Sequence, residues 1–127
     1  MSTDGTVGGE RIALTMRTSW LSEFRTASGV LVMFDILGQR VSFGRLCTVL
    51  ARIPGVEFAD FKIPARFTGP ARFRFKGQDF HVTMAHLDYR VSALDPIAAY
   101  SQSATLLAHV KEQLAQRSPQ VTTHRLI

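Results

Sequence analysis

The clearest pattern in this chain is the strict alternation of apolar and basic side chains over residues 71–76. The apolar positions are Ala71, Phe73 and Phe75, and the basic positions are Arg72, Arg74 and Lys76. Because successive side chains of a strand point to opposite faces, a period of two predicts a strand with one face in a core and a basic face outside it. Gly77 and Gln78 follow, with glycine first, as a type II′ turn requires.

The same alternation continues and predicts a three-stranded antiparallel meander over residues 72–92. A turn at 77–78 would pair Phe75 with Phe80, and a second turn at 85–86 would pair Phe80 with Val91. In this register every cross-strand pair is apolar with apolar or polar with polar, which favours it over a slip by one residue. The polar face would then carry a row made of Arg74, His81 and Arg90.

The remaining pattern predicts further strands and two long helices. Strands are expected at 11–16, at 30–37, where both faces are apolar, and at 56–62. Helices are expected at 43–53 and 96–116, where apolar residues recur at helical spacing behind the N-cap candidates Ser42 and Asp95. Ser19 suggests a short helix over 20–25.

We therefore predict an α+β fold. Its antiparallel sheet would have five or six strands, including the meander, and the helices would pack on one face. The polar, glycine-rich residues 1–9 are expected to form a flexible N-terminal tail, and residues 10–127 a single α+β domain. Residues 120–127 are expected to be a tail or a short edge strand.

The positive charge of the chain is concentrated in one segment. The 127 residues include 15 Lys and Arg against 10 Asp and Glu, a net charge of +5. Between residues 61 and 78 there are five basic residues and no acidic one, so this segment supplies the whole excess. A single cysteine excludes an internal disulfide, and no apolar run is long enough to cross a bilayer. These features predict a cytoplasmic protein without a membrane partner.

The polar face of the meander holds the candidate ligand or partner-binding residues, which are Arg72, Arg74, Lys76, His81 and Arg90. Guanidinium groups flanking an imidazole could hold a phosphate or a carboxylate. Neutralising phosphates with such a face would also give affinity for nucleic acid. The aromatic residues of these strands alternate to the other face, however, where they cannot stack on bases. The competing interpretation is a solvated face with no ligand.

Other residues give weaker indications of chemistry. Cys47 lies on the apolar side of its predicted helix, where a thiol is usually inert. Asp35 interrupts an apolar strand. It is expected to lie near the end of the strand or to be paired with an arginine such as Arg40, and the alternative is an acid or base with a raised pKa. The histidines show no ligand spacing, so no metal site and no cofactor are expected.

The function that these observations favour is a small non-catalytic binding or adaptor protein. It would turn its basic sheet face toward an acidic protein partner or toward a second copy of itself, as a homo-oligomer. Nucleic-acid binding through the same face is the alternative. An enzyme or binder that acts on a small anionic ligand through Arg74, His81 and Arg90 is the third hypothesis.

Overall fold

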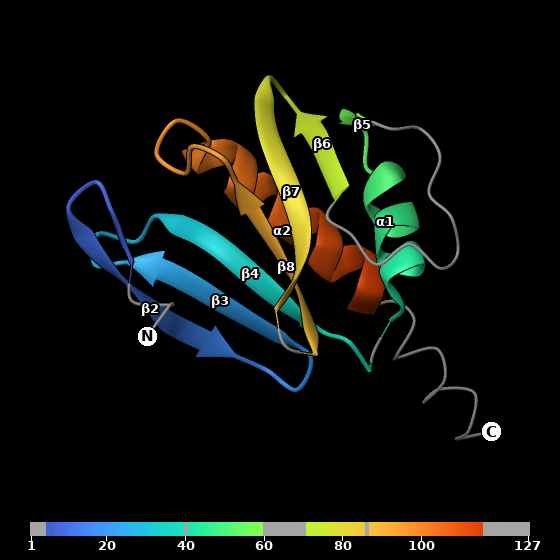
Figure 1. Cartoon of the computed structure of the whole chain (residues 1–127), viewed down its shortest axis with the longest axis horizontal. Helices are drawn as coiled ribbons and strands as arrows, with labels where there is room; N and C mark the ends of the chain where they lie inside the picture. The colour runs from blue at the N-terminus through green and yellow to red at the C-terminus, as the bar shows by residue number, and fades with distance from the viewer. Residues whose placement is uncertain (1–4, 40, 60–70, 86, 116–127) are drawn as a thin grey trace.

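The computed structural model describes residues 5–39, 41–59, 71–85 and 87–115, without the side chains of Ala85 and Ala115. It is an α+β structure with one antiparallel sheet and two helices (Figure 1). The strands are β1 (Thr6–Val7), β2 (Glu10–Arg17), β3 (Leu21–Thr26), β4 (Leu31–Leu37), β5 (Val56–Phe58), β6 (Ala71–Phe75), β7 (Gln78–Ala85) and β8 (Asp88–Ala93). The helices are α1 (Phe43–Ala51) and α2 (Tyr100–Ala115).

The sheet consists of two runs of consecutive strands joined in its middle. Its order is β1-β2-β3-β4-β8-β7-β6-β5, so β4 pairs with β8 and the two runs meet there. In the chain, α1 lies between the runs and α2 follows the second. The α+β class and the antiparallel sheet confirm the prediction, but the sheet has 8 strands in the described residues rather than five or six.

The core lies between one face of the sheet and the two helices. In Figure 1, α2 crosses behind the sheet and α1 lies beside β5 and β6. The largest buried side chains include Phe34 of β4, Phe75 of β6, Phe80 of β7 and Leu106 of α2. Ring contacts tie the strands together, with Phe73 stacked on Phe80 at 5.3 Å between centroids. Phenylalanines at alternate positions therefore fix which face of β6 and β7 points inward.

The predicted helix over residues 20–25 is wrong, because this segment is β3. Thr18 closes a tight turn between β2 and β3: its N–H donates to the Leu21 carbonyl oxygen at 2.8 Å, and its hydroxyl accepts from the Leu21 N–H at 3.1 Å. The polar residues before Trp20 thus belong to a hairpin turn rather than to a helix cap. The ladders to β2 and β4 then decide the conformation of the segment.

Two predicted helix starts can be compared with the structure. Ser42 is the N-cap of α1, since its Oγ accepts from the Arg45 N–H at 3.2 Å. Asp95 instead caps a turn that precedes α2, because its Oδ1 accepts from the Ala98 N–H at 3.2 Å and the helix begins at Tyr100. None of the helices in the described ranges is long and apolar enough to span a bilayer.

Part of the segment expected to be an N-terminal tail belongs to the sheet. Gly8 and Gly9 have φ angles of +60° and +84°, the pair of positive values that a type I′ turn needs, and they join β1 to β2. The Ile12 N–H donates to the Gly5 carbonyl oxygen at 3.1 Å, which extends this short hairpin by one residue. Some of the predictions concern residues outside the described ranges. These are the start of the N-terminal tail (1–4), the end of the strand predicted at 56–62 (60–62), and the last helix residue with the C-terminal segment (116–127).

Candidate functional site

Four of the five candidate residues lie on the face of the sheet that is turned away from α1 and α2, here called the outer face. The fifth, Lys76, lies in the turn after β6, with its Nζ 5.5 Å from the ring centroid of Phe75. Arg72 and Arg74 alternate with the buried Phe73 and Phe75 of β6, and His81 follows the buried Phe80 of β7. Because side chains alternate along a strand, these polar groups must point away from the helices. This is the face seen in Figure 1, with α2 behind it.

The predicted row of Arg74, His81 and Arg90 is wrong, because both hairpin turns lie one residue from their predicted places. Lys76 and Gly77, with φ angles of 49° and 85°, form the first turn, and β6 therefore pairs Arg72 with His81 and Arg74 with Asp79. Moving a turn by one residue shifts the pairing by two positions. That shift keeps the side chains within the strands on their predicted faces and changes only their neighbours, while Lys76 moves from the strand into the turn.

In the second hairpin, β7 pairs Thr83 with Arg90 and His81 with Ser92. The three members of the predicted row therefore stand in three different rows. Arg74 lies beside Asp79, His81 lies between Arg72 and Ser92, and Arg90 lies between Thr83 and Asp35. The structure does not bring two guanidiniums together around the imidazole.

Arg90 is held by an ion pair in the middle of the outer face. Its Nε and Nη2 each donate to a different oxygen of Asp35, both at 2.8 Å, and its guanidinium lies 5.3 Å from the ring centroid of Phe24. The hydrogen bonds that Arg90 donates to Asp35 raise the pKa of Arg90, against the opposing effect of burial. Asp35 is thus paired with an arginine as expected, although the partner is Arg90. Arg40 lies outside the described residues.

Arg74 and His81 also have partners within the sheet. The Nε of Arg74 contacts Asp79 Oδ1 at 3.2 Å, in an ion pair whose side chains are both about half exposed. Such exposed pairs contribute little to stability. His81 is half-buried, and its Nε2 lies 3.3 Å from the Ser92 hydroxyl. Burial, followed by the positive charge of Arg72, lowers the pKa of His81 from its ordinary value.

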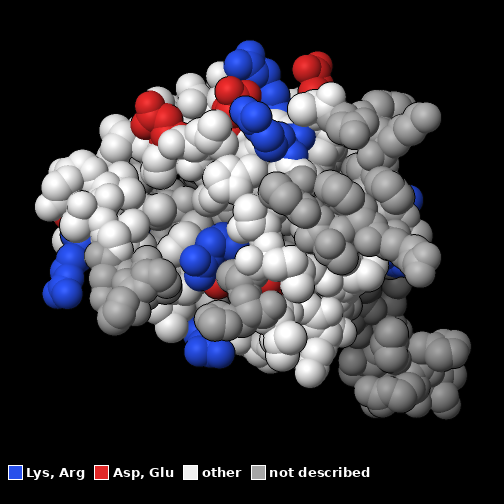
Figure 2. All heavy atoms as spheres, viewed as in Figure 1, with Lys and Arg blue, Asp and Glu red and all other residues white. Residues whose placement is uncertain are grey.

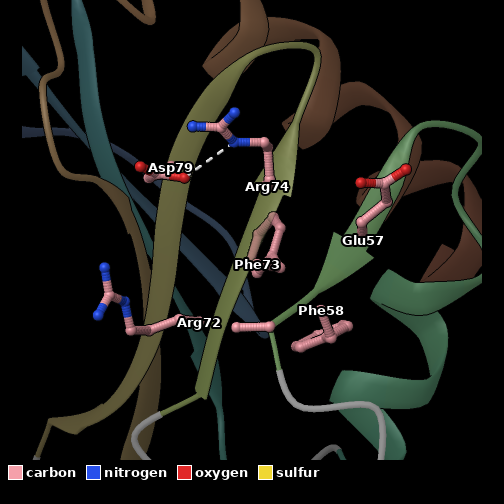
Figure 3. A pocket seen from close by; sticks show the side chains of 7 residues that line it. Glu57, Phe58, Arg72, Phe73, Arg74 and Asp79 are labelled. Carbon is pink, nitrogen blue, oxygen red and sulfur yellow. Dashed lines mark hydrogen bonds and ion pairs between the residues drawn. The ribbon is translucent and has the colours of Figure 1, made fainter.

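Arg72 and Lys76 remain as exposed cations without a carboxylate partner in the described ranges. Arg72 borders a groove of ≈ 270 Å³ between β5, β6 and β7. The groove is lined by Glu57, Phe58, Ala59, Arg72, Phe73, Arg74 and Asp79. Figure 3 shows the Arg72 side chain extending across β7, away from Phe58, while Arg74 turns toward Asp79. The guanidinium of Arg72 therefore points away from the groove and over β7, where an external anion could reach it.

Carboxylates are interspersed among these cations. Glu57 stands opposite Arg74 on β5, and Asp35, Asp79 and Asp88 lie on the same face. Figure 2 shows basic and acidic side chains next to one another on this side of the molecule. The outer face is thus a mixture of charges in the described residues. Arg72 on β6 and Arg17 on β2 are exposed on this face without a carboxylate partner in those residues. The basic segment over residues 61–78 also contains Lys62 and Arg66, which lie outside the described residues.

One buried charge cluster escaped the sequence analysis. Glu23 of β3 is 2% exposed on the helix-facing side, and its carboxylate contacts Arg25 at 2.8 Å and Lys111 of α2 at 2.9 Å. Burial alone would raise the pKa of Glu23, but the two cations outweigh that effect and the pKa is lowered. The misassigned helix over 20–25 concealed this residue, because only a strand places Glu23 on the same face as Leu21. The ion pair between Glu23 and Lys111 links α2 to β3.

The remaining nucleophile and metal candidates can also be placed. Cys47 is fully buried on α1, and burial raises its thiol pKa to about 11, which disfavours the reactive thiolate. Among the described residues no group of His, Cys, Asp or Glu is arranged to hold a metal ion. Comparison with known proteins finds no matching family model, no matching curated protein and no matching solved structure.

Proposed function

We propose that this protein is a small non-catalytic binding module that contacts an acidic partner protein through the outer face of its sheet. The contact would be centred on Arg72, at the rim of the groove between β5 and β7. Self-association through the same face is part of the proposal, with carboxylates of a second copy in the place of the acidic partner. A cytoplasmic location belongs to the proposal as well.

The observation that carries the proposal is the contrast between Arg72 and the two other candidate arginines, Arg74 and Arg90. Arg74 and Arg90 each already hold a carboxylate, whereas Arg72 has none in the described part of the chain and is exposed. A guanidinium presents a planar set of donors that matches carboxylate geometry. The groove beside it is lined by Phe58 and Phe73, whose rings pack against each other, and by the carboxylate-bearing Glu57 and Asp79. The exposed guanidinium therefore suits an acidic side chain of a partner.

A catalytic use of the same residues draws no support from this geometry. A general base and its anion-binding groups must converge on one reacting position. Here His81 faces Ser92, Arg90 faces Asp35, and Arg74 faces Asp79, in three separate rows.

The proposal is tested with fluorescently labelled poly-L-glutamate as a model acidic protein. Binding is followed by anisotropy at several salt concentrations for the wild type and for Arg72→Gln. An exposed charge pair contributes up to about 1 kcal/mol, so the substitution should weaken binding by about five-fold and reduce its salt dependence. Arg45→Gln is the matched control, because Arg45 is an exposed arginine on α1. Equal binding by Arg72→Gln and the wild type would contradict the proposal.

Nucleic acid is the competing acidic partner, and the same assay separates it. Labelled single-stranded DNA is titrated in parallel, and unlabelled DNA is used to displace poly-L-glutamate. The aromatic rings of β6 and β7 face the helices, so base stacking should add nothing to charge attraction. DNA that binds much more tightly than poly-L-glutamate, with a dependence on Arg72, would replace the acidic protein by nucleic acid as the partner.

A further inference from the structure

β2 is a long strand that contributes no side chain to the hydrophobic core. None of its residues belongs to the core cluster, and Leu14 and Met16 are 45% and 50% exposed. Ala13 and Thr15 between them are exposed as well. A strand of an antiparallel sheet normally packs at least one face against a core. In the described structure β2 is attached mainly through its ladder to β3 and leaves both faces open.

The outer edge of β2 is also without a partner strand over residues 13–17 in the described ranges. β1 pairs only with Glu10 and Arg11, and the Ile12 N–H is taken by Gly5. Since backbone groups alternate along a strand, the Leu14 N–H points to the same side as that of Ile12, away from β3. The segment therefore offers unpaired backbone donors and acceptors, the template for an added strand.

The side chains of β2 show which kind of strand would fit. A β-bulge between Leu14 and Met16 puts Leu14 beside Phe24 on the outer face and Met16 beside Glu23 on the other. An incoming strand would therefore meet apolar side chains on both faces. Arg11 and Arg17 bracket the segment, and both are exposed without a carboxylate partner in the described part of the chain. The nearby Glu10 is engaged, since its Oε1 accepts from the Ser28 N–H at 2.8 Å.

These charges favour an acidic partner over a second copy of the chain. Two β2 strands paired with each other would bring four arginines to one short interface and, among the described residues, no free carboxylate. Like charges across a strand pair are destabilising, whereas opposite charges stabilise it. A strand with an apolar centre and Asp or Glu at its ends would complement β2 in both respects.

We propose that residues 13–17 of β2 form a docking edge that accepts an extended, acid-flanked apolar segment of a partner protein as an added strand. This surface is separate from the one around Arg72, because β2 and β6 lie in opposite halves of the sheet. A negative result for one of the two surfaces therefore leaves the proposal for the other unaffected.

The test uses a labelled synthetic peptide, Glu-Val-Thr-Val-Thr-Glu, with the full-length protein. A peptide with lysines in place of both glutamates tests the charge requirement, and one with proline in its centre tests backbone pairing. Anisotropy gives the affinities, and amide NMR locates the contact. We expect the glutamate-flanked peptide to bind best and to shift the amide signals of residues 13–17. The proline-containing peptide should bind at least about ten-fold more weakly.

Protein variants separate the backbone contribution from the charge contribution. Leu14→Pro removes an N–H that points away from β3, so the sheet should tolerate it while the peptide loses a partner. Leu14→Thr is the matched control, because it keeps the N–H. The double change Arg11→Glu and Arg17→Glu should lower affinity for the glutamate-flanked peptide about ten-fold and raise it for the lysine-flanked one. Arg45→Glu with Arg52→Glu, both exposed at α1, is the control for net charge.

Thermal unfolding identifies any variant that fails to fold. If Leu14→Pro does not fold, the double change Arg11→Glu and Arg17→Glu still tests whether the peptide binds at β2. Arg72→Gln should bind the peptide as the wild type does, and a loss there would assign the peptide to the other surface. Equal binding of both charged peptides would overturn the proposal. Peptide binding that requires deletion of residues 1–4 would overturn it in favour of the chain's own N-terminus. Dimerisation that Leu14→Pro abolishes would overturn it in favour of a second copy.

Discussion

At the scale of single residues, the Asp35–Arg90 pair shows how a charged side chain can be nearly buried on the outer face of the sheet. Asp35 is 8% exposed although no helix covers it in the described structure. Its neighbours on the sheet, together with the Arg90 guanidinium stacked over Phe24, exclude water from it. Both carboxylate oxygens are paired, so the cost of burying the charge is offset by two charge-assisted hydrogen bonds.

We therefore predict that Asp35→Asn destabilises the protein far more than loss of an exposed pair. Removing one partner of a buried ion pair leaves the other uncompensated, which costs about 3 kcal/mol. Asp79→Asn, which breaks the exposed pair with Arg74, should cost less than about 1 kcal/mol. Chemical denaturation of both variants gives the two free energies of unfolding. Similar losses for the two variants would show that the Asp35–Arg90 pair is solvated.

At the scale of elements, the hairpin between β6 and β7 shows what its sequence could and could not predict. The alternation of Phe73 and Phe75 with basic residues correctly predicted the strand and the face of each side chain. It could not locate the turn, because pairings that differ by two positions satisfy the same alternation. Glycine fits the first position of a type II′ turn or the second of a type I′ turn, and the structure has the latter, with Lys76 at φ 49°.

The prediction for the β3 segment was wrong for a different reason. The helix prediction over 20–25 rested on local residues, whereas the segment is held as a strand by partners on either side, Ile12–Arg17 and Leu31–Ile36. Non-local pairing of this kind overrides a local cap signal. The same limit applies to the outer face. The sequence identified Arg72, Arg74, His81 and Arg90 as outward-facing, but which of them met a carboxylate depended on strand register.

The turn geometry yields a prediction for Lys76. A positive φ is costly for lysine, and asparagine tolerates it better, so Lys76→Asn should stabilise the protein by about 0.5 kcal/mol. Gly77→Ala should destabilise it by about 1 kcal/mol, because Gly77 has a φ of 85°. Lys76→Gln is the control that removes the charge without changing the backbone preference. Thermal and denaturant unfolding measure all three. A gain from Lys76→Gln as large as that from Lys76→Asn would assign the effect to charge instead.

At the scale of the whole molecule, the hydrophobic core is distributed unevenly across the sheet. Helix α2 packs on β4 and α1 packs beside β5. The cluster of buried residues draws on β3, β4 and β6 to β8 but contains no residue of β1 or β2. The N-terminal hairpin is therefore held mainly by backbone hydrogen bonds to β3, with little apolar burial to stabilise it. Regions with few buried contacts open locally at a free energy well below that of global unfolding. This uneven core is also why β2 is available to a partner.

We predict that native-state hydrogen exchange divides the sheet accordingly. Amides that pair β4 with β8 should exchange only through global unfolding, whereas the Ala13 amide, directed at β3, should exchange through local opening. The decisive variant is Val82→Ala, which removes buried methyl groups from β7 and lowers global stability without touching β2. It should speed exchange in β4 and β8 in proportion to the lost stability and leave Ala13 unchanged. If exchange of the Ala13 amide accelerated by the same factor, β2 would unfold only together with the core and would not be an edge that opens separately.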